Sequence, residues 1–352
     1  MRALVQRIAQ ASAVLLAVGS LIGSPALAQE KVLNLYSARH YQTDEALYAN
    51  FTKATGIKIN RVDTDDAGLL ARLKSEGASS PADVVLLVDA ARLWQAESDG
   101  LFLPVKSAAL QQRIPAHLRA KPRSDGAEAW FGFSTRARVI VYNKAAVNKA
   151  EVQNYQDLAS PSLKGKVCTR SGSHPYNLSL FGSMHEHLGA AKTEQWLKAV
   201  AENMARAPKG GDTDQIKAVA SGECGVALTN SYYLARLMRS TKPEDREVVE
   251  KVGLVFPNQS STGTHMNIAG GAVARHTKNQ ALAVQFLEYL ASAEAQIYFA
   301  NGNNEWPAVP GVKLNNPALD TMGAFKAETI PVADVGANIP KVQQMLDRVG
   351  YK

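Results

Sequence analysis

A continuous apolar run, Val84–Val88, is the feature that most limits the folds open to this chain. Five apolar residues without alternation suit a strand that is buried on both faces, as in a parallel sheet covered by helices. Before it come a strand-like segment at Val32–Tyr36, a helical pattern from Thr43 to Gly56, and a second strand at Ile57–Val62. This alternation predicts an α/β fold in which mixed, mostly parallel sheets are flanked by helices.

The same alternation returns further along the chain. A long strand-like segment, Phe131–Tyr142, precedes a second set of elements that begins with a strand at Lys166–Thr169. The spacing of apolar residues over Lys278–Phe299 predicts one long helix. Because 352 residues exceed the usual size of a single core, we expect two lobes.

The first 28 residues have the pattern of a secretory signal peptide. Arg2 and Arg7 form a basic start, an apolar run follows, and Ala26 and Ala28 match a cleavage site. The apolar run is shorter than the roughly 20 residues that a membrane-spanning helix needs. We therefore expect an exported, periplasmic protein without stable insertion in a membrane.

The charge of the chain bears on whether it binds nucleic acid. The formal net charge is +7, but no basic run with interleaved aromatic residues indicates nucleic-acid binding.

The two cysteines, Cys168 and Cys224, lack the spacing of a metal-binding motif. In an exported chain a pair of cysteines predicts a disulfide, and two buried thiols are the alternative.

Four tyrosines lie in loops that follow predicted strands. They are Tyr41, Tyr176 and the adjacent pair Tyr232 and Tyr233. Ligands of open α/β sheets bind at the carboxyl ends of the strands, so this placement favours a ligand site. Taken alone, a tyrosine such as Tyr41 is more often a packing or surface residue, so the signal comes from the four together.

Phenol oxygens suit one class of ligand in particular. Ferric ion is small, hard and highly charged, and it prefers anionic oxygen to sulfur. A phenol has a pKa of about 10, but a bound cation strongly favours the phenolate. Tyr232 and Tyr233 diverge by about 100° in a regular helix, so both reach one ion only from a helix start or an irregular backbone. We expect a helix start there.

These segments give the chain a clear likeness to a known family. It resembles the ferric-ion-binding periplasmic proteins of bacterial ABC transporters over essentially the whole mature length. The matching stretches are Leu35–Tyr41 (LYSARHY), Ser134–Lys144 (STRARVIVYNK), Val167–Tyr176 (VCTRSGSHPY), Thr229–Leu237 (TNSYYLARL), Phe286–Gln296 (FLEYLASAEAQ) and Asn301–Val312 (NGNNEWPAVPGV). The HY and SYY segments are specific for the iron-binding branch of the wider class.

The resemblance implies a set of site residues. The iron ligands would be His40, Tyr41, Tyr176, Tyr232 and Tyr233, although family members differ in whether the histidine binds iron. The resemblance also implies a carbonate-like anion held by an arginine near the hinge strand. Arg136 is our choice for that arginine and Arg138 is the rival, while Arg39 would add charge beside the site.

The resemblance further implies a two-lobed periplasmic binding protein fold of type II with Fe(3+) in a cleft between the lobes. We expect residues 29–134 with 263–313 to form the N-terminal lobe and residues 135–262 with 314–352 the C-terminal lobe. The protein would be a monomer, would have no enzymatic activity, and would deliver iron to an inner-membrane ABC permease.

Two other functions remain open at this point. A receptor of the same fold could bind an anion or a small organic, thiamine-like solute in place of iron. Ser37, His40 and Asp44 are close in sequence, as a hydrolase site would require. However, the chain lacks the G-x-S-x-G and H-E-x-x-H motifs, and this argues against hydrolysis.

Overall fold

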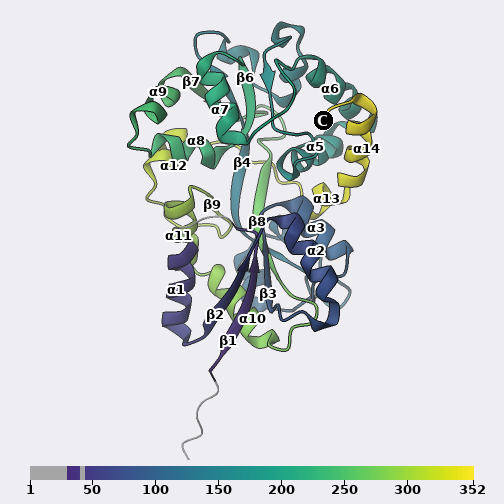
Figure 1. Cartoon of the computed structure of the whole chain (residues 1–352), viewed down its shortest axis with the longest axis vertical. Coiled ribbons are helices and arrows are strands. Elements are labelled where there is room, and N and C mark those ends of the chain that lie inside the picture. The colour runs from purple at the N-terminus through teal and green to yellow at the C-terminus, as the bar shows by residue number, and fades with distance from the viewer. Residues whose placement is uncertain (1–29, 40–43) are drawn as a thin grey trace, which may run out of the picture. The chain divides into compact units, whose positions relative to one another are not determined.

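The computed structural model describes residues 30–39 and 44–352, and Val32–Lys352 forms one compact unit (Figure 1). The predicted signal peptide, His40 and Tyr41 lie outside the described residues.

A mixed sheet runs through this unit. In the described residues its strands are β1 (Val32–Ser37), β2 (Lys58–Asp63), β3 (Val84–Leu87), β4 (Phe131–Asn143), β5 (Val167–Cys168), β6 (Val226–Asn230), β7 (Val252–Val255), β8 (Met266–Val273) and β9 (Trp306–Pro307). Their order is β2-β1-β3-β8-β4-β6-β5, and β7 and β9 also pair with β4. Strands β2, β1 and β3 are parallel, as are β5 and β6, whereas β8 and β4 are antiparallel to their neighbours. The α/β class that the sequence predicts is confirmed.

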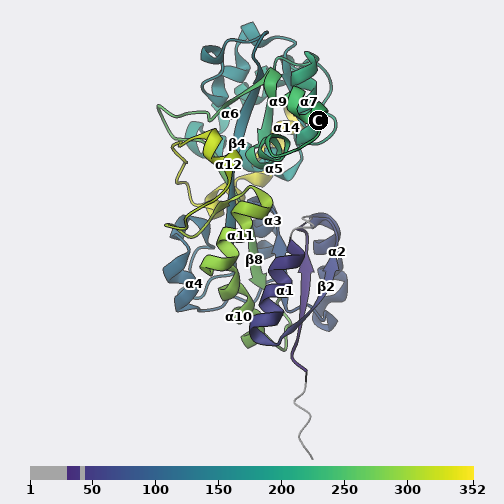
Figure 2. The same cartoon turned by 90° about the vertical axis from the view of Figure 1, so that its left-hand side faces the viewer.

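Helices cover this sheet. The first seven described helices are α1 (Asp44–Thr55), α2 (Asp66–Glu76), α3 (Ala90–Ser98), α4 (Ala108–Arg113), α5 (Pro175–Leu188), α6 (Ala190–Glu202) and α7 (Asp212–Ser221). The others are α8 (Ser231–Met238), α9 (Pro243–Lys251), α10 (Gln280–Leu290), α11 (Ala293–Asn303), α12 (Pro317–Met322), α13 (Val332–Ala337) and α14 (Ile339–Val349). Helix α11 lies beside α1 in both views (Figure 1 and Figure 2).

The predicted long helix at Lys278–Phe299 is wrong, because the segment forms two helices. Helix α10 ends at Leu290 and α11 begins at Ala293. Between them, the side chain of Ser292 accepts a hydrogen bond from the backbone N–H of Ala295. A serine in this position satisfies a backbone donor at a helix start, and this favours a new helix over continuation of the old one.

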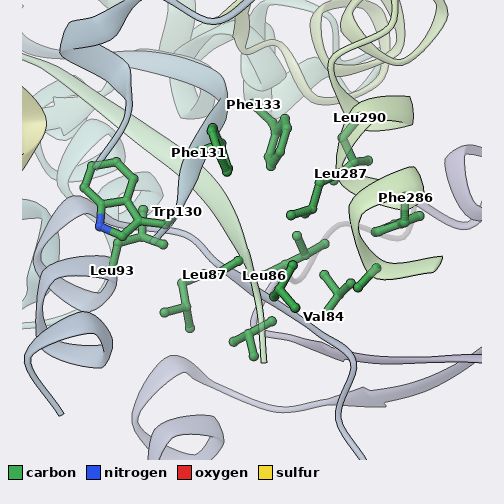
Figure 3. Packing of buried hydrophobic residues seen from close by; sticks show 14 of the residues in the cluster. Val84, Leu86, Leu87, Leu93, Trp130, Phe131, Phe133, Phe286, Leu287 and Leu290 are labelled. Carbon is green, nitrogen blue, oxygen red and sulfur yellow. The ribbon is translucent and has the colours of Figure 1, made fainter. Parts of the chain in front are cut away.

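The first hydrophobic core surrounds β3. All four residues of Val84–Leu87 are buried, which confirms the doubly covered strand that the sequence predicts. Figure 3 shows Phe131 and Phe133 of β4 above this strand, with Phe286 of α10 to one side. Full burial of a side chain of this kind contributes roughly 1.5–3 kcal/mol relative to exposure.

The second core lies on both faces of β4 and β6. Ile140 and Leu228 point into one cluster, whereas Val139 and Ala227 point into the other. This division follows from the alternation of side chains along a strand. The strand β4 belongs to both cores, because residues up to Ala137 pair with β8 and the later ones pair with β6 and β7.

A disulfide joins Cys168 to Cys224, as the sequence predicts, with their Cα atoms 5.9 Å apart. It fixes β5 to the segment that leads into β6.

Helices α13 and α14 belong to different cores. Val332, at the start of α13, packs in the first core, whereas Val342 and Leu346 of α14 pack in the second. The lobe boundaries given above stay a prediction. Within the described part of the chain, no helix combines the length and the apolar character that crossing a membrane requires.

Candidate functional site

Tyr176 and Tyr232 meet where two helices begin. Each is the second residue of its helix, in α5 and α8 respectively, and both side chains are buried. Their hydroxyl oxygens are 3.2 Å apart. The strands before these helices, β5 and β6, are adjacent and parallel, so both helices start at the same edge of the sheet. Topology therefore brings together two side chains that are 56 residues apart in sequence.

The backbone around each tyrosine is fixed by local contacts. His174 precedes α5, and its Nδ1 accepts the backbone N–H of Tyr176 at 3.2 Å. Pro175 occupies the first helical position, where its missing N–H costs nothing. Before α8, the backbone N–H of Asn230 donates to a carboxylate oxygen of Asp212 at 2.7 Å. These contacts set the direction in which both tyrosines leave the sheet.

The adjacent Tyr232 and Tyr233 sit at a helix start, as the sequence predicts. Their rings stack with centroids 4.2 Å apart and planes inclined by 29°. Tyr233 is half-buried, whereas Tyr232 is fully buried. The two rings therefore lie side by side, although neighbouring side chains diverge by about 100° in a regular helix.

Three arginines surround the tyrosine rings. The guanidinium carbons of Arg136 and Arg170 lie 5.6 and 4.9 Å from the ring centroid of Tyr176. Arg236 lies 5.9 Å from the ring of Tyr232 and 5.4 Å from that of Tyr233. Guanidinium groups at these distances are attracted to aromatic faces. They also make the surroundings favourable for a phenolate.

Burial acts against ionisation of Tyr176. Desolvation raises the pKa of its phenol well above 10, and Tyr233 raises it further. Arg136 and the hydrogen bond shared with Tyr232 lower the pKa of Tyr176, but by less. The phenol is therefore protonated at neutral pH, and a strongly charged cation would have to displace its proton.

The guanidinium groups of Arg136 and Arg138 make different contacts. The guanidinium of Arg138 donates to Asp212 at 2.7 Å, to Asn177 at 2.7 Å and to Asn230 at 3.1 Å. These bonds join α5, α7 and the start of α8 in one scaffold. Of the two arginines, Arg136 is the one whose guanidinium faces the ring of Tyr176.

Asp212 connects the parts of this scaffold, and it is not among the site residues expected from the sequence. Its buried carboxylate accepts hydrogen bonds from Arg138, Arg170 and the backbone of Asn230. An aspartate in the first turn of a helix is a recognisable sequence pattern, and it would have predicted the helix α7. Its role beside the tyrosines requires the fold.

A second buried ionic cluster surrounds Arg39. Its Nε donates to Asp44 at 2.6 Å and its Nη2 to Glu305 at 3.4 Å. The other carboxylate oxygen of Glu305 lies 3.6 Å from Nη1 of Arg136. Arg39 and Asp44 flank the undescribed residues 40–43, so the structure gives no contacts for His40 or Tyr41. Glu305 lies in one of the family-like stretches, but no local sequence pattern indicates its role.

The histidine beside the tyrosines is neutral. The ring of His174 packs edge-on against Tyr176, with centroids 4.5 Å apart. Burial, followed by the positive charges of Arg170, Arg138 and Arg92, lowers its pKa to about 2. A neutral imidazole can accept the backbone N–H of Tyr176, and it adds no positive charge to the site.

Other candidate groups do not assemble a metal site. His187 of α5 and His265, which precedes β8, both contact the buried carboxylate of Glu328. Among the described residues, no group of three or more His, Cys, Asp or Glu side chains could hold a metal ion. The tyrosine hydroxyls are therefore the candidate ligand atoms that the described site offers.

Comparisons with known proteins show which proteins this chain resembles. The family profile for bacterial extracellular solute-binding proteins matches residues 46–327. Iron uptake protein A1 of Synechocystis sp. is 45% identical over 324 residues, covering 92% of this chain and 88% of that protein. The Fe(3+)-binding periplasmic protein of Serratia marcescens is 27% identical over 329 residues, covering 93% of each.

Solved structures show the same similarity. A Trichodesmium protein in complex with iron and citrate ligands aligns with a TM-score of 0.86 and 49% identity, covering 91% of this chain and 100% of that one. The ferric binding protein of Campylobacter jejuni aligns with a TM-score of 0.85 and 39% identity, with the same coverage. The resemblance to ferric-ion-binding proteins is thus confirmed. This chain belongs to the bacterial extracellular solute-binding protein family.

Proposed function

We propose that this protein binds ferric iron in the periplasm and delivers it to an inner-membrane ABC importer. Its ligands are the phenolate oxygens of Tyr176, Tyr232 and Tyr233, together with Tyr41. The observation that carries the proposal is the 3.2 Å separation of the hydroxyl oxygens of Tyr176 and Tyr232 beside Tyr233. Relatives named for iron uptake and for Fe(3+) binding support it.

The separation of the two oxygens suits a single small cation. Ligand oxygens bound at about 2 Å in octahedral geometry lie roughly 3 Å apart. The Tyr176 and Tyr232 oxygens therefore need little movement to share an ion. Each phenol gives up its proton on binding, and three or four phenolates neutralise or slightly exceed the charge of Fe(3+).

The arginines balance the negative charge that remains. Arg136, against the ring of Tyr176, is the proposed holder of a carbonate-like anion that completes the coordination. Arg39 is the further arginine proposed beside the site, where it forms ion pairs with Asp44 and Glu305. His40 is a further proposed ligand, next to Tyr41 in the sequence.

The alternative function is a receptor for an anion or a small organic solute. The guanidinium groups of Arg136, Arg170 and Arg236 favour an anion within this alternative. They disfavour a positively charged, thiamine-like solute, because like charges repel.

Metal analysis and a visible spectrum of protein purified without chelator distinguish the two functions. We expect about one iron per chain and a visible charge-transfer band, because ferric phenolate is coloured. Colourless protein that takes up no iron from a ferric salt complex, but binds an anion, would favour the alternative.

A further inference from the structure

Glu305 is a buried carboxylate shared by two arginines. It follows α11, and its side chain is fully shielded from solvent. One oxygen accepts hydrogen bonds from the hydroxyl of Ser134 at 2.9 Å and from Nη2 of Arg39 at 3.4 Å. The other lies 3.6 Å from Nη1 of Arg136. Because a buried charge is costly unless it is paired, Glu305 serves as the counter-ion that holds both guanidinium groups.

The first arginine belongs to a rigid group at the end of β1. Arg39 forms the 2.6 Å ion pair with Asp44 and lies 4.8 Å over the ring of Phe299. The side chain of Asn303 also donates to Asp44, at 2.8 Å. Arg39 and the start of α1 are therefore fixed to α11, the helix that leads into Glu305.

The second arginine reaches the tyrosines. Arg136 is buried on β4, and its guanidinium faces the ring of Tyr176. The carboxylate of Glu305, 3.6 Å from Nη1 of Arg136, therefore holds this guanidinium in the position from which it faces Tyr176.

We propose that Glu305 is a positioning residue for the iron site. It holds Arg136 against Tyr176 and ties this arginine to the Arg39–Asp44 pair in the first core. Loss of its charge removes the shared counter-ion, and the two guanidinium groups then repel one another. Arg136 is then no longer held beside Tyr176, and the phenolate of Tyr176 loses one of the two guanidinium groups that face its ring. This inference rests on the proposed binding of iron through Tyr176.

The test compares Glu305→Gln with Glu128→Gln. Both carboxylates are buried and paired with arginine, but Glu128 binds Arg119 at 2.6 and 2.7 Å, away from the tyrosines. Each variant is titrated with ferric nitrilotriacetate, and the visible absorption maximum, iron affinity and melting temperature are recorded. Residues that orient metal ligands typically change affinity by about 10–100-fold.

We expect Glu305→Gln to shift the absorption maximum and to weaken iron binding by at least about tenfold. Glu128→Gln should lower the melting temperature and leave both iron readouts unchanged. Glu305→Asp keeps the charge on a shorter side chain, so it should restore part of the affinity, and it serves as the test if the glutamine variant does not fold.

Two results would overturn the role of Glu305. One is a spectrum and an affinity in Glu305→Gln that match the wild type. The other is an equal loss of iron affinity in Glu305→Gln and Glu128→Gln, which would mean that Glu305 acts through stability alone. Failure of the wild type itself to bind iron would instead contradict the proposed function.

Discussion

Asp212 and Arg138 form a fully buried ion pair, with oxygen and nitrogen 2.7 Å apart, directly behind the tyrosines. Breaking a buried pair from one side typically costs 3–5 kcal/mol, because the remaining charge stays buried. We expect Asp212→Ala to lower the free energy of unfolding by about that amount, measured by urea denaturation. Arg138→Ala should cost a similar amount, and a change below about 1 kcal/mol in both would contradict this role.

Tyr176→Phe should weaken iron binding while changing the stability of the fold only slightly. The variant removes one hydroxyl and keeps the buried ring, so the free energy of unfolding should change by only about 1 kcal/mol. Iron affinity should fall by at least about tenfold, because one ligand atom is lost. Tyr351→Phe is the matched control, since its buried hydroxyl pairs with Thr169 and lies outside the cluster. Equal iron affinity in the two variants would exclude Tyr176 as a ligand.

We expect the protein to lose stability in acid because of the buried carboxyl group of Glu328. Burial raises the pKa of this carboxyl, but His265, His187 and Ser183 outweigh that effect and lower it to about 2. A carboxyl with a depressed folded-state pKa stabilises the protein above its unfolded value of about 4.5, and this contribution disappears as pH falls toward 2. The contribution at neutral pH is roughly 3 kcal/mol, at about 1.4 kcal/mol per pKa unit.

Urea midpoints of the wild type and Glu328→Gln, measured at pH 6, 5, 4 and 3, check this prediction. The wild type should be the more stable at pH 6, and the difference should shrink below pH 4.5. A difference that stays constant over this range would show that Glu328 does not titrate as described.

The disulfide should stabilise the second core through the loop that it closes. Its cysteines are 56 residues apart, and loop-closure entropy then contributes about 4 kcal/mol. We expect Cys168→Ala with Cys224→Ala to lower the free energy of unfolding by about that amount. The pairing itself is checked by a thiol assay on denatured, unreduced protein, where two free thiols would contradict it.

Local patterns predicted the elements that carry the site. The run Val84–Val88 predicted a strand buried on both faces, and β3 is one. The tyrosines after the strands predicted a common edge, and the parallel pairing of β5 with β6 brings Tyr176 and Tyr232 into contact. Both predictions succeed because they depend on strand geometry and on neighbouring residues.

The charged groups behind the tyrosines could not be predicted in this way. Glu305 meets Arg39 across 266 residues, and Asp212 meets Arg138 across 74. No periodicity links such pairs, because they come together only when separate strands join the same sheet. The break between α10 and α11 was missed for a different reason. The apolar spacing continues across Ser292, and only the capping bond shows that a new helix begins.

The most direct test of the account is a ferric titration of the wild type and of Tyr232→Phe combined with Tyr233→Phe, followed by visible absorption. The wild type should develop a charge-transfer band that saturates at about one iron per chain. The double variant should keep its circular dichroism spectrum but show no band and no tight iron binding. Tight iron binding with an unchanged band in the double variant would contradict the tyrosine site.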